Sequence, residues 1–250
     1  MVQKGLNTRS YIDNFFDLHD LKVLSKAELS TMELLIEFAK KRLGHRSSLI
    51  LLKMSFDLLL PAASLDNGTT TRQCPAFARR VTADFPDLAF VFMTYYNVIV
   101  QYGIERFCRE CADIGIKGLI VPDAYPEESG PLLEACRACG VAPILIATPY
   151  TPDERLVRLA EQTSGFLYCA ARKGVTGAKT ALGRETNDFL TRARRVARTP
   201  IGVGFGVHTP EDLRFLQGKC DIAIIGTKLL HVLEQDGLAG VERFLCTLNG

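Results

Sequence analysis

The sequence lacks the features that mark nucleic-acid-binding, membrane and secreted proteins. Its 250 residues carry a formal net charge of +2, with neither an acidic tail nor a basic block, so we expect no broad binding to nucleic acid or to membrane surfaces. No apolar run approaches the ~18 residues that a transmembrane helix needs. Charged residues are scattered through the first thirty positions, so no signal peptide is predicted.

The chain also lacks linkers, low-complexity stretches and a dinucleotide-binding fingerprint. We therefore expect residues 1–250 to form a single domain, of the size typical for one (βα)8 barrel. The glycines of Gly202-x-Gly204-x-Gly206 do not have the spacing G-x-G-x-x-G. They also come late in the chain, whereas the Rossmann fingerprint opens its domain. We expect neither a cofactor nor a metal ion.

Eight cysteines are spread through this large chain, which favours reduced thiols in a cytoplasmic protein over a disulfide scaffold. Four of them form the pairs Cys108-x-x-Cys111 and Cys136-x-x-Cys139. Two such pairs are a zinc signal, but both fall inside helical patterns and lack the turn that zinc ligands usually occupy. Packing in the core is the preferred interpretation, and a metal or redox role is the alternative.

Short apolar runs alternate with helical patterns along most of the chain. The runs are continuous and rich in β-branched residues, which is typical of parallel strands buried on both faces. The predicted fold is therefore an α/β (βα)8 TIM barrel, and an open doubly wound sheet is the alternative. The expected strands are residues 21–24, 48–56, 89–93, 118–122, 143–146, 166–170, 201–207 and 222–227, and the clearest expected helices are 31–42, 104–114, 131–139, 153–162, 187–197 and 228–234.

Two glycine-containing turns near the end of the chain predict a phosphate site. The strand 201–207 precedes a helix start with Thr209 as N-cap and Pro210 as first residue, and strand 222–227 ends in Gly-Thr before the next helix. Backbone amides at such positions point toward an anion, and the last two strands of a (βα)8 barrel commonly hold a phosphate. The alternative is that the glycines serve only tight turns.

The remaining candidate residues follow the carboxyl ends of the predicted strands, where barrel enzymes place their chemistry. Aromatic residues occur there together with the predicted phosphate site, which indicates a ligand with a flat or apolar body and a phosphorylated tail. The loop 173–186 contains three glycines and is predicted to close over that ligand. The candidates are Lys53, Asp57, Tyr95, Asn97, Asp123, Tyr168, Arg172, Lys173, Phe205, Gly226 and Thr227.

Four motifs, at residues 92–97, 121–129, 172–177 and 204–206, recur in an order and spacing that resemble the tryptophan synthase alpha chain family. The resemblance covers about residues 88–245. It implies a (βα)8 barrel that cleaves indole-3-glycerol phosphate to indole and glyceraldehyde 3-phosphate by a retro-aldol step, and that passes indole to a pyridoxal-phosphate-dependent beta chain.

The resemblance also implies roles for individual residues. The phosphate would rest on amides near Gly177, Gly206 and Gly226 and on Thr227, under a loop that contains Arg172 and Thr176. The indole pocket would be lined by Tyr95, Ile120, Tyr168 and Phe205.

The chain departs from the family at the residues that handle protons. The family's strand-two glutamate aligns with Leu51 and its loop aspartate with Ala62, and neither replacement can transfer a proton. The loop 56–63, which contacts the beta chain in the family, has also changed. The standard reaction and the standard partnership are therefore both open.

Three residues are the candidate replacements. Lys53 lies two residues beyond Leu51, on the same face of a strand, where a desolvated amine could act as a base or form a Schiff base. In the alternative interpretation it extends to solvent at the rim. Asp57 is either a substitute acid or a loop carboxylate, and Asp123 either orients polar groups or caps the next turn.

Two main hypotheses follow. The first is a lyase of the alpha-chain type with an altered active site, acting on indole-3-glycerol phosphate or a related phosphorylated compound. The second is a non-catalytic subunit that binds a phosphorylated ligand and regulates a partner such as a tryptophan synthase beta chain. A stand-alone sensor of phosphorylated metabolites is a third alternative.

Overall fold

The computed structural model describes residues 52–55, 73–84, 86, 89–171, 183–204 and 207–248. Several predictions lie outside this part of the chain, including the strand at 21–24 and the helix at 31–42. The candidate site residues outside it are Asp57, Arg172, Lys173, Thr176, Gly177, Phe205 and Gly206.

Strands and helices alternate along the described residues, as the apolar runs predict. The strands are β1 (Leu52–Ser55), β2 (Phe90–Met93), β3 (Gly118–Ile120), β4 (Ala142–Ile144), β5 (Ile146–Ala147), β6 (Leu167–Ala170), β7 (Ile201–Gly204) and β8 (Ile222–Ala223). The helices are α4 (Gln73–Asp84), α5 (Tyr96–Tyr102), α6 (Ile104–Asp113), α7 (Gly130–Cys139), α8 (Asp153–Gln162), α9 (Arg184–Val196), α10 (Pro210–Leu216) and α11 (Thr227–Leu248).

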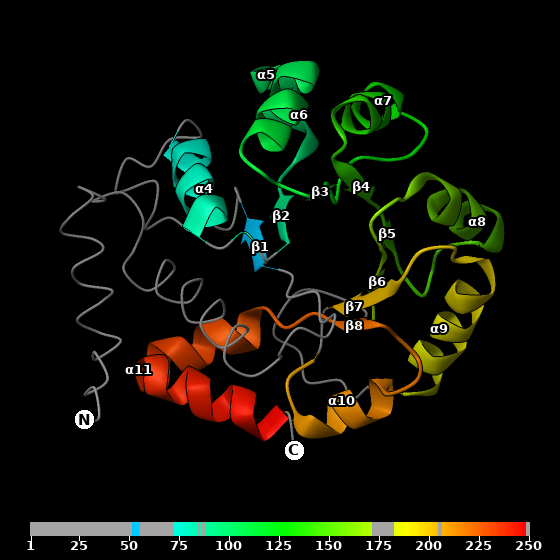
Figure 1. The fold of residues 1–250 in the computed structure, drawn as a ribbon. Helices are drawn as coiled ribbons and strands as arrows, with labels where there is room; N and C mark the ends of the chain where they lie inside the picture. The colour runs from blue at the N-terminus through cyan, green and yellow to red at the C-terminus, as the bar shows by residue number, and fades with distance from the viewer. Residues whose placement is uncertain are drawn as a thin grey trace, which may run out of the picture.

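The strands pair in parallel in the orders β1-β2-β3-β4 and β5-β6-β7-β8. They occupy the centre of the molecule and the helices surround them (Figure 1). One buried cluster joins the two sheets, because it contains side chains from β2, β3 and β4 as well as from β6 and the segment after β8. A core shared between the inner faces of both sheets is the interior of a closed (βα)8 barrel, so the predicted fold class is confirmed.

The predicted strand at 143–146 differs from the structure. It is divided into β4 and β5, which pair with different neighbours: Ile144 is in register with Ile120 of β3, and Ile146 with Tyr168 of β6. The change of sheet at this point is invisible in the sequence, because both segments are equally apolar.

β2 is apolar on both faces because each face meets a different core. Val91 and Met93 belong to the interior cluster, whereas Phe90 and Phe92 belong to a second cluster that includes residues of α4, α6 and α7. Successive side chains of a strand point to opposite faces, so a strand covered on both sides carries no polar position.

Two of the glycines that led us to predict a phosphate-binding turn lie inside β7 and have a packing role. A Cβ atom on Gly202 would come within 2.6 Å of the Phe166 ring, and one on Gly204 within 2.0 Å of the Tyr168 hydroxyl oxygen. Both distances are far below a van der Waals contact, so these positions accept only glycine while the rings of Phe166 and Tyr168 keep their places.

The predicted start of α10 is confirmed. Thr209 is the N-cap and Pro210 the first helical residue, and the Thr209 hydroxyl accepts a hydrogen bond from the backbone N–H of Asp212 at 3.2 Å. The Asp212 carboxylate in turn accepts from the N–H groups of His208 and Thr209, each at 2.9 Å. This capping box satisfies the amides of the turn that leads into α10.

The helix predicted at 228–234 is longer in the structure. α11 extends from Thr227 to Leu248 and is broken at Gly237, which has φ 63° and ψ −164°. Among the described residues, no helix has the length and apolarity to cross a membrane.

Candidate active site at the carboxyl ends of the strands

The floor of the candidate site is an apolar layer inside the barrel. Met93, Ile120 and Ile144 are in register across β2, β3 and β4, and all three belong to the interior cluster. Tyr168 belongs to the same cluster. The structure thus brings together two of the four residues predicted to line an indole pocket, Ile120 and Tyr168.

Tyr168 is 2% exposed. Its hydroxyl lies so close to Gly204 that a side chain at position 204 would overlap it. Burial raises the pKa of its phenol well above the usual value, because the phenolate would lose its hydration. The hydroxyl therefore stays protonated at neutral pH and acts as a hydrogen-bonding group, not as a base.

Asp123 follows β3 and is bound to the neighbouring strand-end loop. Its Oδ1 atom accepts a hydrogen bond from the backbone N–H of Tyr96 at 2.9 Å. Tyr96 is the first residue of α5, and its preceding residue, Tyr95, is the N-cap without a side-chain cap of its own. The Asp123 carboxylate thus caps α5 from another loop, a favourable place for a negative charge near a helix N-terminus.

Tyr95 is 49% exposed, in contrast to Ile120 and Tyr168. The structure does not place it in the buried interior cluster with them. Its backbone position is fixed through the Asp123 hydrogen bond to the next residue.

Lys53 occupies the second position of β1, in register with Val91, while Ser55 is in register with Met93. Residues in register across a parallel ladder share a face, so position 53 is on the face of Val91, which belongs to the interior cluster. The sequence placed Lys53 near the carboxyl end of its strand. The register places it one layer below Met93, further from the carboxyl ends.

Gly226 and Thr227 form the turn from β8 into α11. A Cβ atom added to Gly226 would meet nothing within 4 Å, and its carbonyl accepts the Leu229 N–H at 2.8 Å. Ile224, two residues earlier, belongs to the interior cluster together with Tyr168. The first amides of α11 therefore begin beside the apolar floor, where a helix N-terminus can receive an anion.

A groove of about 290 Å³ opens between the segment after β3 and the segment after β5. Its wall includes the exposed residues Tyr125 and Tyr150, together with Thr148, Thr151 and Arg155. The Thr148 backbone N–H donates to the Thr151 hydroxyl at 2.9 Å, which fixes the turn that carries Tyr150.

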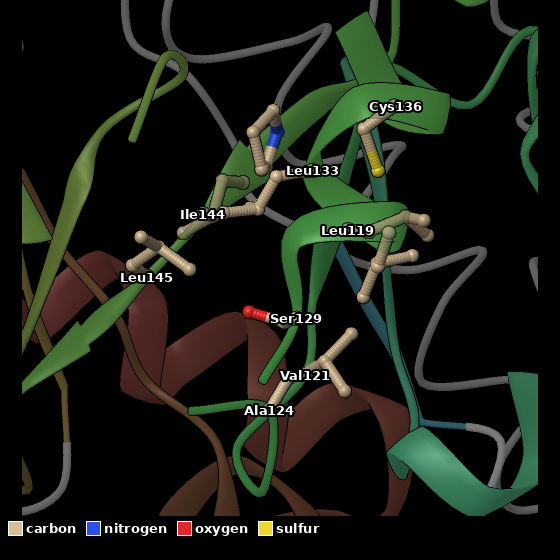
Figure 2. A pocket seen from close by; sticks show the side chains of 10 residues that line it. Leu119, Val121, Ala124, Ser129, Leu133, Cys136, Ile144 and Leu145 are labelled. Carbon is tan, nitrogen blue, oxygen red and sulfur yellow. The ribbon is translucent and has the colours of Figure 1, made fainter. Parts of the chain in front are cut away.

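A second cavity lies under α7, enclosed by residues of β3, β4 and α7 (Figure 2). Its volume is about 10 Å³ and its lining is apolar apart from Ser129 and Cys136. A space of that size holds at most about one water molecule, so it is no site for a phosphorylated substrate.

Sequence reasoning missed two residues that organise this edge of the barrel. The Thr186 hydroxyl donates to the Ala171 carbonyl oxygen at 3.1 Å and thus joins the residues on either side of segment 172–182. Arg192 of α9 donates to the Thr151 carbonyl oxygen at 2.6 Å and to Asp153 Oδ1 at 2.7 Å. Their partners are 15 to 41 residues away, and no local pattern in the sequence points to them.

The paired cysteines lie in α6 and α7, as the helical patterns predict. Cys108, Cys111 and Cys136 are buried in the outer core and Cys139 packs against it, as the packing interpretation predicts. Within the described part of the chain, no group of three or more His, Cys, Asp or Glu side chains could hold a metal ion.

Comparison with known proteins assigns the chain to a family. Residues 61–247 match the family described as tryptophan synthase alpha chain. The chain belongs to this family. The match is longer than the region 88–245 over which the motifs carry the resemblance, and it begins just before Ala62.

Individual relatives agree with this assignment. The tryptophan synthase alpha chain of Desulforapulum autotrophicum is 46% identical over 186 residues, which is 74% of this chain and 73% of that protein. The alpha chain of Syntrophotalea carbinolica is 38% identical over 238 residues, covering 95% of this chain and 89% of that protein.

Solved structures of tryptophan synthase alpha subunits share the fold. The structure of the mutually activated tryptophan synthase α2β2 complex of Pyrococcus furiosus aligns with a TM-score of 0.73 at 26% identity, covering 89% of this chain and 91% of that chain. The tryptophan synthase alpha subunit of Campylobacter jejuni aligns with a TM-score of 0.65 at 30% identity, covering 75% of this chain and 74% of that chain. This alpha chain family member is therefore a TIM barrel.

Proposed function

We propose that this protein is a lyase that cleaves indole-3-glycerol phosphate, or a related phosphorylated compound, by a retro-aldol step. The observation that carries the proposal is one arrangement at the carboxyl ends of the strands. Ile120 and Tyr168 form an apolar floor, and Ile224 connects that floor to the turn at Gly226 where α11 begins. Membership of the alpha chain family supports the same substrate class.

The apolar floor suits the flat indole part of the substrate. Ile120 is fully buried, and the neutral phenol of Tyr168 adds a ring next to it. Indole gains free energy when it leaves water for such a surface, at about 25 cal/mol per Å² of apolar area.

The phosphate would bind at the start of α11. The first N–H groups of a helix have no intrahelical partner; in α11 these precede Leu229, whose N–H donates to the Gly226 carbonyl oxygen. A Cβ atom at Gly226 would meet nothing within 4 Å, so the space around it is open. Positive partial charge at a helix N-terminus favours a dianionic phosphate there. The roles of Arg172, Thr176, Gly177, Phe205 and Gly206 stay predictions.

Proton transfer is assigned to Lys53, and Asp123 to positioning. Retro-aldol cleavage requires a proton to be delivered to the indole ring and another to be removed from the hydroxyl that becomes the aldehyde. By register, position 53 lies level with Val91, one layer below Met93, so the proposed role requires the lysine to extend toward the carboxyl ends of the strands, where a desolvated amine would have a lowered pKa. The Asp123 carboxylate already accepts the Tyr96 N–H, so its proposed task is to hold Tyr95 and Tyr96 in place. Asp57 stays a candidate acid.

The decisive test is to incubate the protein with indole-3-glycerol phosphate, to assay free indole, and to measure binding by calorimetry in the same sample. We expect turnover that Lys53→Ala reduces by 10²-fold or more, because a single acid/base group contributes about 10² to 10⁴-fold. Binding without any indole formation would contradict a lyase and support the non-catalytic alternative. If the protein shows no binding and no turnover, both the lyase and the non-catalytic ligand-binding hypotheses are refuted.

Asp123 has its own control. Asp123→Asn retains an oxygen that can accept the Tyr96 N–H, whereas Asp123→Ala does not. If Asp123 positions the loop, the asparagine variant keeps most of the activity and only the alanine variant loses it. Equal losses in both variants would instead indicate that the carboxylate acts on the substrate.

The second candidate function is regulation of a tryptophan synthase beta chain, and the same edge of the barrel supports it. Tyr95, Tyr125 and Tyr150 are each about half exposed, and the latter two line the 290 Å³ groove. Exposed aromatic residues of this kind are enriched in protein interfaces. We expect co-elution with a beta chain and a change in its rate, both weakened by Tyr150→Ser. Absence of both effects with the wild-type protein would exclude this function.

A further inference from the structure

Two cysteines from different helices meet in the outer core. The Sγ atoms of Cys108 in α6 and Cys136 in α7 are 3.7 Å apart, and neither residue is exposed. Each has a second cysteine three positions later on its own helix: the buried Cys111 and the half-buried Cys139. α6 and α7 lie side by side on the outside of the first sheet (Figure 1).

We propose that Cys108 and Cys136 are a thiol-oxidation site, at which a small-molecule disulfide converts the two thiols into an internal disulfide that links α6 to α7. This inference does not depend on the proposed lyase activity, because the two sulfur atoms lie behind the sheet and not at the carboxyl ends of the strands.

The geometry requires only a small movement. A disulfide bond is about 2.05 Å long, so the two sulfur atoms must approach by ~1.7 Å from their present separation. Cys136 also borders the 10 Å³ cavity under α7, together with Leu119 and Leu133 (Figure 2). Unfilled space next to a side chain lowers the packing cost of its displacement.

The chemistry is a balanced thiol–disulfide exchange. The two protein thiols lose two protons and two electrons as the Sγ–Sγ bond forms, and the reagent disulfide is cleaved to two small thiols. Cys108 is the expected nucleophile, because the thiol of Cys136 hydrogen-bonds to it and holds the pKa of Cys108 below its ordinary value. The reagent must reach buried sulfur, so opening at the half-buried Cys139 end of α7 would limit the rate.

The bond would close a chain segment that carries the candidate site. Residues 108 and 136 are 28 positions apart, and the segment between them contains β3, Ile120 and Asp123. A cross-link over a loop of that length restricts the unfolded chain. For a protein of this size we expect the thermal midpoint to rise by roughly 5 °C or more.

The test treats the full-length folded protein with glutathione disulfide, blocks the remaining thiols with an alkylating reagent, and maps cross-linked peptides by mass spectrometry. We expect one peptide pair joined through Cys108 and Cys136, and the higher thermal midpoint, both reversed by dithiothreitol. A map with Cys136 joined to Cys139, or with glutathione adducts and no cross-link, would overturn the proposal.

Matched variants separate the pair from its neighbours. Cys108→Ser should abolish the cross-linked peptide and the rise in thermal midpoint, whereas Cys111→Ser, one turn away and equally buried, should keep both. If Cys108→Ser does not fold, Cys136→Ala answers the same question. Loss of the cross-link in Cys111→Ser would also count against the proposed pair.

Discussion

The two sheets of the barrel fill its interior with side chains of different shape. The first sheet contributes aliphatic and thioether side chains such as Met93 and Ile120, and it sends its phenylalanines outward to the helices. The second sheet does the reverse, because Phe166 and Tyr168 point into the barrel over Gly202 of β7 and its neighbour Gly204. In this barrel the two large rings fit inside because the adjacent strand β7 has glycine at the positions that face them.

The largest expected effect comes from removal of an interior ring. Phe166→Ala should lower the free energy of unfolding by about 3–5 kcal/mol, the usual cost of a buried Phe→Ala change, measured by urea denaturation. Adding Gly202→Ala should recover part of that loss, because the new methyl group enters the space that the ring left, 2.6 Å from its former edge. If the double variant is less stable than Phe166→Ala alone, the ring and the glycine do not share one space.

Gly204→Ala tests the same requirement for glycine opposite an interior ring, here by adding a methyl group next to Tyr168. Its Cβ would overlap the Tyr168 hydroxyl, and overpacking of this kind costs about 1–3 kcal/mol. Gly130→Ala is the matched control, since a Cβ at the start of α7 meets nothing within 4 Å. We expect the thermal midpoint to fall for the first variant and to stay within experimental error, or rise slightly, for the second.

Thr209→Ala should lower the free energy of unfolding by about 1 kcal/mol, the typical value for loss of an N-cap side chain. The N-cap residues of the described helices α5 to α9 make no side-chain cap hydrogen bond of their own, whereas α10 has a complete capping box. Thr209→Ser keeps the hydroxyl and should keep the stability. Equal chemical denaturation midpoints for the alanine variant and the wild type would show that the cap contributes nothing.

The smallest effect is expected from an ion pair at the base of β7. Burial raises the pKa of Asp221, but hydrogen bonds from Arg194 and from the Ile201 N–H at 2.7 Å outweigh it, so the pKa lies below its ordinary value. A lowered pKa in the folded state stabilises the protein above about pH 4, and this stabilisation disappears as the pH falls through the folded-state pKa.

Asp221→Asn should therefore be less stable than the wild type at pH 7, and the difference should shrink as the pH falls below about 4. Both side chains of the pair are 44% exposed, so solvent screening keeps the difference below about 1 kcal/mol. Urea denaturation of both proteins at several pH values measures it, and a difference that persists unchanged at low pH would assign it to packing instead of charge.

These contrasts also explain what could be predicted from the sequence. Most strands and the barrel could be predicted, because strands such as β2, β3, β6 and β7 are buried on both faces and read as apolar runs. The helix start at Thr209 could also be predicted from the sequence, because the hydrogen-bonding partners in its capping box lie within four residues of one another. Ile120 and Tyr168 were predicted as pocket residues only through the family resemblance.

Other features depend on partners that are distant in sequence. Gly202 reads like part of a phosphate-binding turn until the Phe166 ring is seen opposite it. The partner of Asp123 is a backbone amide 27 residues earlier, so the choice between orienting polar groups and capping the next turn could not be made locally. Likewise, the depth of Lys53 in the barrel depends on its register with Val91, which no run of residues encodes.

The break in α11 has a consequence for protein engineering. Gly237 adopts a backbone conformation that is essentially restricted to glycine, and Leu229 and Val232 before it form one cluster with Val241 and Leu245 after it. The last helical segment thus folds back as a brace on the segment that begins at the proposed phosphate site. Shortening the chain to residue 236 would expose the apolar surface of Leu229 and Val232. An expression tag should therefore follow residue 248, so that the last helical segment is retained.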